Sequence, residues 1–353
     1  MARPSRAEVF DPDEVAIAHV FNRTVRRCFL MGDDAVSGKN FDHRKAWIED
    51  YLRQFAAFFG IDLICYAIMS NHFHLILRSR PDVVATWDNR EVARRWLMIC
   101  PERCSADLKP LPPNEAEINS IANCPVKCQD IRKRLSNFSW WMRLLCQRVA
   151  QRSNNEEKER GKFFQDRYGA TRLTDEASLL ACAAYVDLNP IRAAMAMTLE
   201  SSDHTSVQTR IKALATHETD QKGNEQDPPA DAFLSPLTIN EQTDPIGPLP
   251  SQNGKRCSDK GVLAMPIEEY LRLLDWTARQ SVPGKCGCTP SDLPPVLRRL
   301  GLDSKTWCEL VSDFGKLFCH VAGRPEHVDT IRSHRTHRRY YLRRRARELF
   351  AAT

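Results

Sequence analysis

Two neighbouring segments with the composition of strands constrain this chain most, because only two residues separate them. Residues 61–69 and 72–78 are rich in apolar and β-branched side chains. Ser70 and Asn71, which lie between them, are residue types that favour turns. The sequence therefore predicts two strands that are joined directly by this turn.

A strand and a helix are expected before this pair. Residues 16–25 alternate and are rich in apolar and β-branched types, which predicts a strand. Residues 42–59 carry apolar side chains at helical spacing, with Asp42 as the expected N-cap. The predicted order in this part of the chain is strand, helix, strand, strand.

The pattern weakens over about residues 81–135, where Pro, Cys and charged residues recur, and we interpret this stretch as an insertion. One helix is expected within it, near residues 90–99. Beyond the insertion, residues 136–152 predict an amphipathic helix. The basic, aromatic segment 162–172 is compatible with a short strand.

The second half of the chain changes in composition. Residues 216–253 hold seven acids, one Lys and six Pro in 38 residues. This composition predicts a disordered acidic linker, placed at 216–260. Apolar residues at helical spacing then predict an all-helical module over residues 261–353, which ends in an Arg-rich helix. The linker would follow a first domain of residues 1–215.

The formal net charge of +6 is local. Residues 331–347 contain eight Arg and no acid, so the rest of the chain has 43 basic and 45 acidic residues, a net charge of −2. The hydrophobic content of 42% excludes a wholly disordered protein. No run of about 18 apolar residues and no signal-peptide core occur, so we expect a cytoplasmic protein without a membrane segment.

The 13 cysteines do not indicate a disulfide framework, because their number is odd and they are scattered through a large chain. Two pairs have the spacing of metal ligands, Cys100 with Cys104 and Cys124 with Cys128. Free thiols explain these pairs better than a zinc knuckle, which stays the alternative.

The segment AIMSNHFHLIL, residues 67–77, is the most informative short stretch. In a strand, His72 and His74 project from the same face, while Phe73 and Leu75 point to the other. Two neutral imidazoles so close together could bind a metal ion. Taken alone, the pattern favours two half-exposed strand histidines over a metal site.

A second candidate pair lies in a later helix, which is expected to begin at an N-cap at Thr174 and to end at Pro190. Tyr185 and Asn189 are four residues apart and therefore share one face of this helix. A phenol, an amide and two imidazoles could converge on one divalent ion. Taken singly, Tyr185 reads as an ordinary helix aromatic and Asn189 as a C-terminal cap.

Together these motifs carry a resemblance to a known family. The segments YAIMSNHFHLIL and GKFFQDRYGATRLTDEASLLACAAYVDLNPIRA resemble the catalytic core of the REP-associated tyrosine transposases, which belong to the HUH single-tyrosine transposase superfamily. The resemblance runs from about His19 to Ser206 and is interrupted by the insertion. It implies a fold of the α+β class, a ferredoxin-like antiparallel sheet with helices.

The resemblance also implies the chemistry. His72 and His74 fall on the metal-binding pair, Asn189 on the third metal-binding position, and Tyr185 on the nucleophile. The expected activity is metal-dependent cleavage and rejoining of single-stranded or hairpin DNA through a 5′-phosphotyrosine, with Mg²⁺ or Mn²⁺ as the cofactor. Tyr168, close to Arg167, is the only serious rival for the nucleophile.

Basic residues suggest where DNA would bind. Residues 132–172 hold 11 basic and 4 acidic residues with Trp and Phe interleaved, which are the materials of single-strand binding. The alternative is a solvated arginine face over Trp residues in the core. The terminal Arg stretch predicts a basic amphipathic helix, which could bind nucleic acid, lie on an anionic membrane or be solvated, and DNA contact is the preferred reading. The candidate DNA contacts are Arg143, Arg148, Lys162, Arg167, Arg172, Arg338, Arg339 and Arg343.

Two other functions fit the same sequence. A domesticated hairpin-DNA-binding protein could keep the fold without catalysis. A metal-dependent hydrolase could use His72 and His74 without a covalent intermediate, but no acidic residue lies near them at a suitable spacing. A monomer and a homodimer are both compatible with the sequence.

Overall fold

The computed structural model describes residues 9–105, 110–219, 228–239, 247–280, 294–333 and 341–351. A five-stranded sheet lies at its centre, with the strand order β4-β5-β1-β6-β7. All neighbouring strands are antiparallel except β6 and β7, which are parallel. The strands are β1 (Ile17–Arg23), β4 (Ile61–Ile68), β5 (His72–Ser79), β6 (Gly169–Leu173) and β7 (Val321–Ala322).

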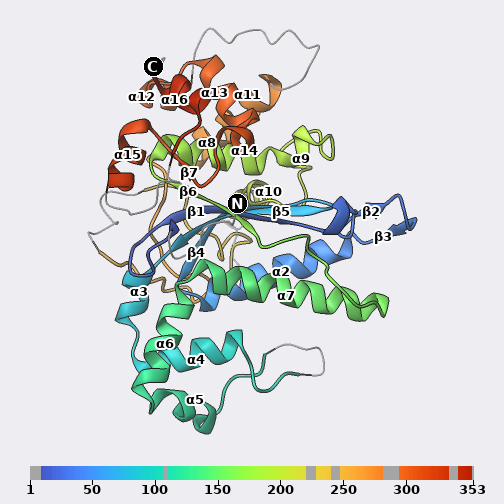
Figure 1. Ribbon diagram of the computed structural model, residues 1–353, viewed down its shortest axis with the longest axis vertical. Helices are drawn as coiled ribbons and strands as arrows, with labels where there is room; N and C mark the ends of the chain where they lie inside the picture. The colour runs from blue at the N-terminus through green and yellow to red at the C-terminus, as the bar shows by residue number, and fades with distance from the viewer. Residues whose placement is uncertain are drawn as a thin grey trace.

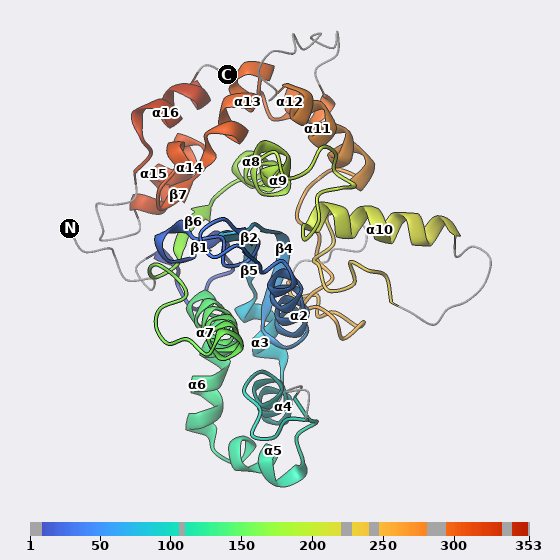
Figure 2. The same cartoon turned by 90° about the vertical axis from the view of Figure 1, so that its right-hand side faces the viewer.

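Helices cover both faces of this sheet (Figures 1 and 2). Helices α2 (His43–Phe58) and α7 (Phe138–Glu157) lie together on one face, and α8 (Glu176–Asp187) lies on the other. All eight residues of β4 are buried, as a strand requires when helices pack on both of its sides. The α+β class and the expected order strand, helix, strand, strand are confirmed.

An aromatic cluster joins α2 to α7. The Trp141 ring on α7 lies 5.3 Å from the Phe55 ring and 5.2 Å from the Phe59 ring, measured between centroids. Trp141 has no exposed surface. This residue of the basic, aromatic region therefore belongs to the core, as the alternative reading of that region predicted.

The stretch between β5 and α7 forms four helices that extend away from the sheet on the side of α2 and α7 (Figures 1 and 2). The one helix expected here is confirmed as α4, and three others were not predicted. Pro at the first turn starts α3 and α6, and a capping box between Asn114 and Glu117 starts α5. The helices are α3 (Pro81–Thr86), α4 (Asn89–Ile99), α5 (Glu115–Ala122) and α6 (Pro125–Leu135).

Helix α8 begins one residue later than expected. Its N-cap is Asp175, not Thr174, because the Asp175 carboxylate accepts a hydrogen bond from the Ser178 amide while the Ser178 hydroxyl completes a capping box. The helix ends at Asp187. Asn189, which was expected to close it, instead starts the short helix α9 (Asn189–Arg192), followed by α10 (Ser206–Thr219).

The C-terminal module covers the side of α8 that faces away from the sheet (Figure 2). The Tyr270 hydroxyl of this module donates a hydrogen bond of 2.7 Å to the buried Asp187 carboxylate, which ties the module to the end of α8. The module's helices are α11 (Ile267–Gln280), α12 (Pro295–Arg299), α13 (Ser304–Ser312), α14 (Phe314–Leu317), α15 (Pro325–Ser333) and α16 (Arg344–Ala351).

The module is not all-helical, because it also supplies β7 to the central sheet. Arg172 of β6 pairs with Val321, and Leu173 pairs with Ala322. A strand of two residues is too short to show the alternation by which strands are recognised in a sequence.

The expected disordered linker is packed where the structure describes it. Phe233 and Leu234 are buried, and the Ser235 amide donates a hydrogen bond to the Leu63 carbonyl of β4 at 2.8 Å. Pro and acidic residues dominate the composition of the segment, but its few apolar residues reach the core. A further hairpin, β2 (Asp33–Asp34) and β3 (Lys39–Asn40), lies apart from the main sheet.

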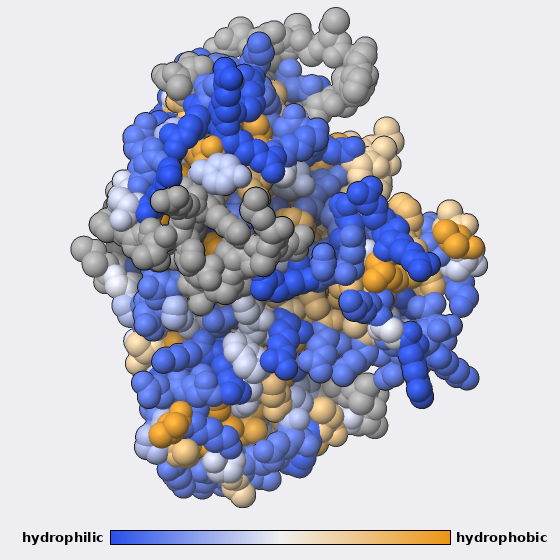
Figure 3. All heavy atoms as spheres, viewed as in Figure 1, coloured by the Kyte–Doolittle hydropathy of each residue, from blue (hydrophilic) through white to orange (hydrophobic). Residues whose placement is uncertain are grey.

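No helix in the described ranges is both long and apolar enough to cross a bilayer. On the face shown in Figure 3, hydrophilic residues cover most of the surface and apolar residues occur in scattered patches.

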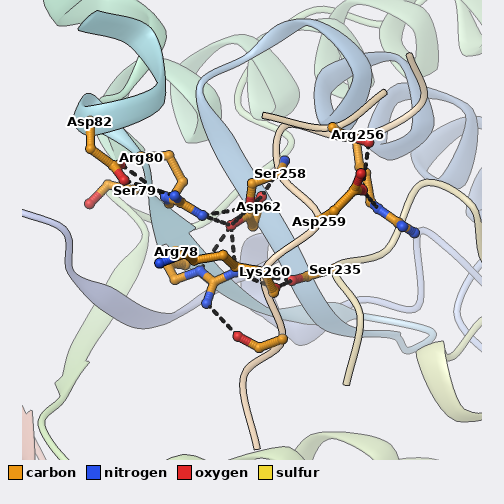
Figure 4. Close-up of polar contacts among 12 residues, drawn as sticks. Asp62, Arg78, Ser79, Arg80, Asp82, Ser235, Arg256, Ser258, Asp259 and Lys260 are labelled. Atoms are coloured by element: carbon orange, nitrogen blue, oxygen red, sulfur yellow. Dashed lines mark hydrogen bonds and ion pairs between the residues drawn. The ribbon is translucent and has the colours of Figure 1, made fainter. Parts of the chain in front are cut away.

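A buried charge network attaches the segment around residue 258 to β4 and β5 (Figure 4). The Asp62 carboxylate accepts hydrogen bonds from Arg78 Nε at 2.9 Å and from the Ser258 amide and hydroxyl at 3.0 and 2.9 Å. Arg80 Nη1 lies 3.4 Å from the same carboxylate. Asp62 has no exposed surface, so its charge depends on these partners.

We predict that Asp62→Ala lowers the free energy of unfolding by about 3–5 kcal/mol, because it leaves the Arg78 and Arg80 charges buried without this partner. Urea denaturation measures the change. Asp50→Ala is the matched control, since Asp50 pairs with Arg53 at the surface and its loss should cost less than about 1 kcal/mol. Equal losses in the two variants would contradict the role given to Asp62.

Candidate functional site

The pairing of β1 with β5 arranges four side chains on the face of the sheet that α8 covers. Arg23 is opposite His72 and Phe21 is opposite His74, and cross-strand partners share a face. The two imidazole centroids lie 5.0 Å apart with the rings nearly perpendicular. The structure thus brings together the two histidines that were expected to project side by side.

Tyr185 reaches this histidine pair from α8. Its ring centroid lies 5.4 Å from that of His74 and 5.9 Å from that of His19. All of these residues belong to one chain, so the candidate nucleophile and the histidines meet without a second copy.

Helix α14 covers Tyr185 on the other side. The Phe314 ring stacks on the Tyr185 ring with centroids 5.8 Å apart and planes 27° apart. A Cβ atom built on Gly315 would lie 3.5 Å from the Tyr185 hydroxyl, which shows how closely the backbone of α14 approaches. The nucleophile candidate is therefore held between the sheet and the C-terminal module.

Asn189 lies at the start of α9, one helical turn after Tyr185. Its Nδ2 atom is buried and has no hydrogen-bond partner among the described residues. The nitrogen and oxygen of an amide can be exchanged by a flip of the group, so the atom at this place could equally be the oxygen. A buried polar atom without a partner is costly, and a bound water molecule or ligand would satisfy it.

The hydrogen bond of His72 determines which of its nitrogens carries the proton. His72 Nδ1 lies 2.6 Å from the Asn71 amide oxygen, which can only accept. Nδ1 therefore carries the proton, and the Nε2 lone pair of the neutral ring is available to a ligand. The Asn71 amide nitrogen donates to the Arg27 carbonyl at 3.0 Å, which fixes the orientation of the amide.

His19 is a partner of His74 that sequence reasoning missed. Its Nε2 lies 2.9 Å from His74 Nδ1, with the ring planes only 15° apart. His74 Nε2 is buried and has no hydrogen-bond partner among the described residues. When His74 Nδ1 donates to His19, the Nε2 lone pair is free in the way that a metal ligand requires.

All three imidazoles are neutral at physiological pH. Burial lowers the pKa of His19 to about 3. Burial and, secondarily, the Arg23 charge lower the pKa of His72 to about 4. Burial also lowers the pKa of His74, with smaller contributions from the neighbouring histidines.

Two arginines act on Tyr185, and neither was predicted. Burial raises the pKa of the Tyr185 phenol, and the charges of Arg192 and Arg23 oppose this effect. The Arg192 guanidinium lies 5.3 Å from the centre of the tyrosine ring and donates to the Val311 carbonyl at 3.2 Å. The position of Arg192 in the sequence, three residues after Asn189, is a signal that could have indicated it.

The predicted ligands His72, His74 and Asn189 are two imidazoles and an amide, a combination that would suit Mn²⁺ and other ions that accept nitrogen better than Mg²⁺. Over the described ranges, no three or more His, Cys, Asp or Glu side chains are arranged to hold a metal ion. The four cysteines with ligand-like spacing form no disulfide within the described residues.

Tyr168, the rival nucleophile, lies elsewhere. Its hydroxyl is 2.9 Å from the Ser139 hydroxyl, and the residue is buried. It lines a cavity of about 590 Å³ beside α7, together with Trp140 and the exposed Arg143. Over the described residues, the aromatic rings in contact with His72 and His74 do not include that of Tyr168.

Two of the expected DNA-binding residues are engaged inside the protein. Arg172 is 5% exposed and donates to the Glu14 carboxylate at 3.1 Å, because the middle of β6 is enclosed by β1 and β7. Arg148 packs over the Phe55 ring and donates to the Ile99 carbonyl. The expectation that these two contact DNA is not supported, whereas Arg143, Lys162 and Arg167 are exposed.

The arginines that the structure describes near the C-terminal end of this stretch have partners within the module. Arg345 pairs with Glu309, and Arg347 pairs with Asp329 at 2.8 Å. The Arg343 guanidinium donates to the Lys316 carbonyl. The predicted contacts Arg338 and Arg339 lie outside the described residues.

Comparisons with known proteins add one similarity. No protein-family model matches the sequence, and no curated protein matches it. A solved structure of a REP-associated tyrosine transposase bound to a REP hairpin is similar to this chain with a TM-score of 0.31 and 9% sequence identity, over 61% of this chain and 90% of that one.

We predict that the stability of the metal-free protein falls as the pH is lowered from about 6.5 to 5. The unfolded chain binds protons on these histidines near pH 6.5, whereas in the folded protein His19 and His72 stay neutral down to about pH 3 and 4. Below the unfolded pKa, each such histidine lowers the free energy of unfolding by up to about 1.4 kcal/mol for every pH unit of acidification. Above the unfolded pKa both states are neutral, and this loss of stability is absent.

His19→Leu should therefore flatten the pH dependence of the free energy of unfolding. Urea denaturation in the presence of a chelator measures this dependence. The control is His327→Gln, because the His327 side chain is 54% exposed. An unchanged slope in His19→Leu would contradict the prediction.

Proposed function

We propose that this protein is a metal-dependent enzyme of the HUH type that cleaves and rejoins single-stranded DNA through a covalent bond to Tyr185. The observation that carries the proposal is the position of the Tyr185 ring, 5.4 Å from His74 and on the face that also presents His72. A phenol that could attack and a pair of neutral imidazoles that could bind metal thus lie together in one chain.

The sheet supports a ferredoxin-like assignment for the core. The sequence order β1, α2, β4, β5, α7, β6 is strand, helix, two strands, helix, strand once the insertion α3–α6 is set aside. The sheet order β4-β5-β1-β6 places the first strand between the third and the fourth, and α2 and α7 share one face. The opposite face is then left for α8 and the site.

The proposed metal site consists of His72, His74 and Asn189. The free Nε2 atom of His72, the buried Nε2 atom of His74 and the unpartnered amide end of Asn189 are the donors that this chain offers. A divalent ion bound there would polarise the scissile phosphate and stabilise the charge on the departing 3′-oxygen. His19 and Asn71 orient the two imidazoles through their Nδ1 atoms.

Tyr185 would supply the nucleophile. Its hydroxyl oxygen forms the bond to phosphorus while the bond from phosphorus to the 3′-oxygen breaks, which leaves a 5′-phosphotyrosine and a free 3′-OH. The phenol must lose its proton, and the positive charges of Arg23 and Arg192 favour the phenolate that burial disfavours. A second 3′-OH can reverse the step on another strand, because the phosphodiester energy is kept in the covalent link.

A second candidate function is binding of hairpin DNA without catalysis. The stacking of Phe314 on Tyr185 favours it, because α14 covers the side of the phenol that faces away from the sheet. The two functions share the DNA partner and differ in whether Tyr185 becomes covalently bonded.

We predict that the purified protein forms a covalent adduct with labelled single-stranded oligonucleotides that carry hairpins, in the presence of Mn²⁺ or Mg²⁺. Denaturing gel electrophoresis detects the adduct, and a random sequence beside the hairpin reports the target. Tyr185→Phe should abolish the adduct completely because it removes the attacking oxygen, whereas Tyr168→Phe should retain it.

An adduct that persists in Tyr185→Phe would overturn the assignment of the nucleophile. Hairpin binding by the wild-type protein with no adduct in either metal would establish the second candidate function instead.

We predict that Mn²⁺ binding depends on the histidine pair and on His19. His74→Ala should abolish binding, and His19→Leu should weaken it about 10–100-fold, because the partner that orients a metal-bound imidazole is lost. Electron paramagnetic resonance of free Mn²⁺ measures the affinity without any DNA. His327→Ala is the control, and affinities equal to the wild-type value in both site variants would refute the proposed metal site.

A further inference from the structure

A groove runs along the edge of the histidine site, between the end of β1, the turn Val25–Arg27 and residues 165–170 before and within β6. Its volume is about 400 Å³. Phe21, Arg23 and Arg27 line it, and Phe21 and Arg23 also stand beside the two histidines. We propose that this groove binds one unstacked nucleotide of a DNA single strand, with the base against Phe21 and its phosphates against Arg23 and Arg27.

Phe21 offers an aromatic surface to solvent. The residue is 38% exposed although it lies within a strand of the central sheet. Its ring centroid is 5.7 Å from that of His74, so a base stacked on Phe21 would lie next to the site. Base stacking on an aromatic side chain is the usual means by which proteins hold single strands.

Gly169 keeps the Phe21 ring in this place. The two residues are paired across β1 and β6, and a Cβ atom added to Gly169 would lie only 2.2 Å from the Phe21 ring. The ring therefore lies across the backbone of β6, in space that any other residue at position 169 would fill. This position of the Phe21 ring therefore requires a glycine at residue 169.

The arginines of the groove supply charge for phosphates. Over the described ranges, neither Arg23 nor Arg27 forms an ion pair with an acidic side chain. Arg167 and Asp166 also line the groove, so three arginines face one aspartate. This excess of positive charge complements a nucleic-acid backbone.

The turn that carries Arg27 is strained and tied to the histidine strand. Arg26 and Arg27 have φ angles of 51° and 61°, which are unfavourable for residues other than Gly. The Arg27 carbonyl accepts from the Asn71 amide nitrogen at 3.0 Å, and the Thr24 hydroxyl donates to the Asn71 carbonyl at 3.0 Å. Strain of this kind persists where the surrounding structure holds a side chain in a functional position.

The groove fits a single nucleotide better than a duplex, because a base can reach the Phe21 ring only after it leaves its stack. The inference deepens the proposed function, since it identifies where the strand beside the scissile phosphate is held. It does not require catalysis or a bound metal ion, so the two proposals can fail separately.

The test compares two probes without divalent metal, an oligothymidylate of roughly twelve nucleotides and a probe of the same length with abasic residues throughout. Fluorescence anisotropy measures both affinities. We expect Phe21→Leu to weaken binding of the oligothymidylate about tenfold and to leave binding of the abasic probe unchanged. Phe21→Tyr, which keeps a ring, should restore the preference for bases.

The arginine contact is tested by the salt dependence of oligothymidylate binding. Arg27→Gln should reduce the slope of log affinity against log salt by about 0.7, the value for one phosphate contact on a single strand. Arg272→Gln, at an exposed position on α11, is the matched control and should leave the slope unchanged.

Either of two results would overturn the proposed groove. In the first, Phe21→Leu weakens the binding of both probes equally. In the second, the salt slope of Arg27→Gln equals that of Arg272→Gln. Absence of the covalent adduct together with the expected probe behaviour would instead refute catalysis and leave the groove in place.

Discussion

The antiparallel register between β1 and β5 is the constraint on which the candidate site depends. It sets Arg23 beside His72 and Phe21 beside His74, on the face that α8 covers. Because side chains alternate between the faces of a strand, a slip of one residue would turn both histidines toward α2 and α7. The register is secured by neighbouring strands on both sides, since β4 pairs with β5 and β6 pairs with β1. The backbone hydrogen bonds of the sheet thus position His72 and His74, the two side chains that the strands would contribute to a metal ion.

Burial between the sheet and the C-terminal module lowers the pKa of the imidazoles and raises the pKa of the phenol, so both kinds of group are held neutral. Loss of water keeps His72 and His74 neutral, which is the state that binds a metal ion. The same loss of water raises the pKa of Tyr185, which makes the phenolate harder to form. Arg23 and Arg192 oppose that shift, and an approaching phosphate would be attracted by the same two charges. Under the proposed function, the imidazoles would bind a metal ion without first losing a proton, whereas Tyr185 would need further help to lose its own.

The alternation of residues in β5 was enough to predict that His72 and His74 share a face. The expected common helix face of Tyr185 and Asn189 stays a prediction, because α8 ends at Asp187 and Asn189 starts α9. The bond from His19 to His74 could not be predicted, because it depends on which strands pair and in which register, and both properties are non-local. The count of basic residues misled at Arg172 for a related reason. A sequence shows a charge, but the Glu14 carboxylate that neutralises it is far away in the chain. The insertion and its helix α4 were predicted, whereas α3, α5 and α6 were not, although Pro at the first turn of α3 and α6 and the capping box of α5 are local signals of a helix start.

The segment that packs against β4 has a consequence for how copies of this chain could associate. β4 forms one edge of the sheet, where free backbone groups would pair readily with a strand from another molecule. Here the Leu63 carbonyl is bonded to the Ser235 amide, and the Ile68 amide is bonded to the His204 carbonyl. The opposite edge is the two-residue β7, which is too short to serve as a template. These contacts on β4 and the shortness of β7 disfavour association of copies through strand pairing at the edges of the central sheet.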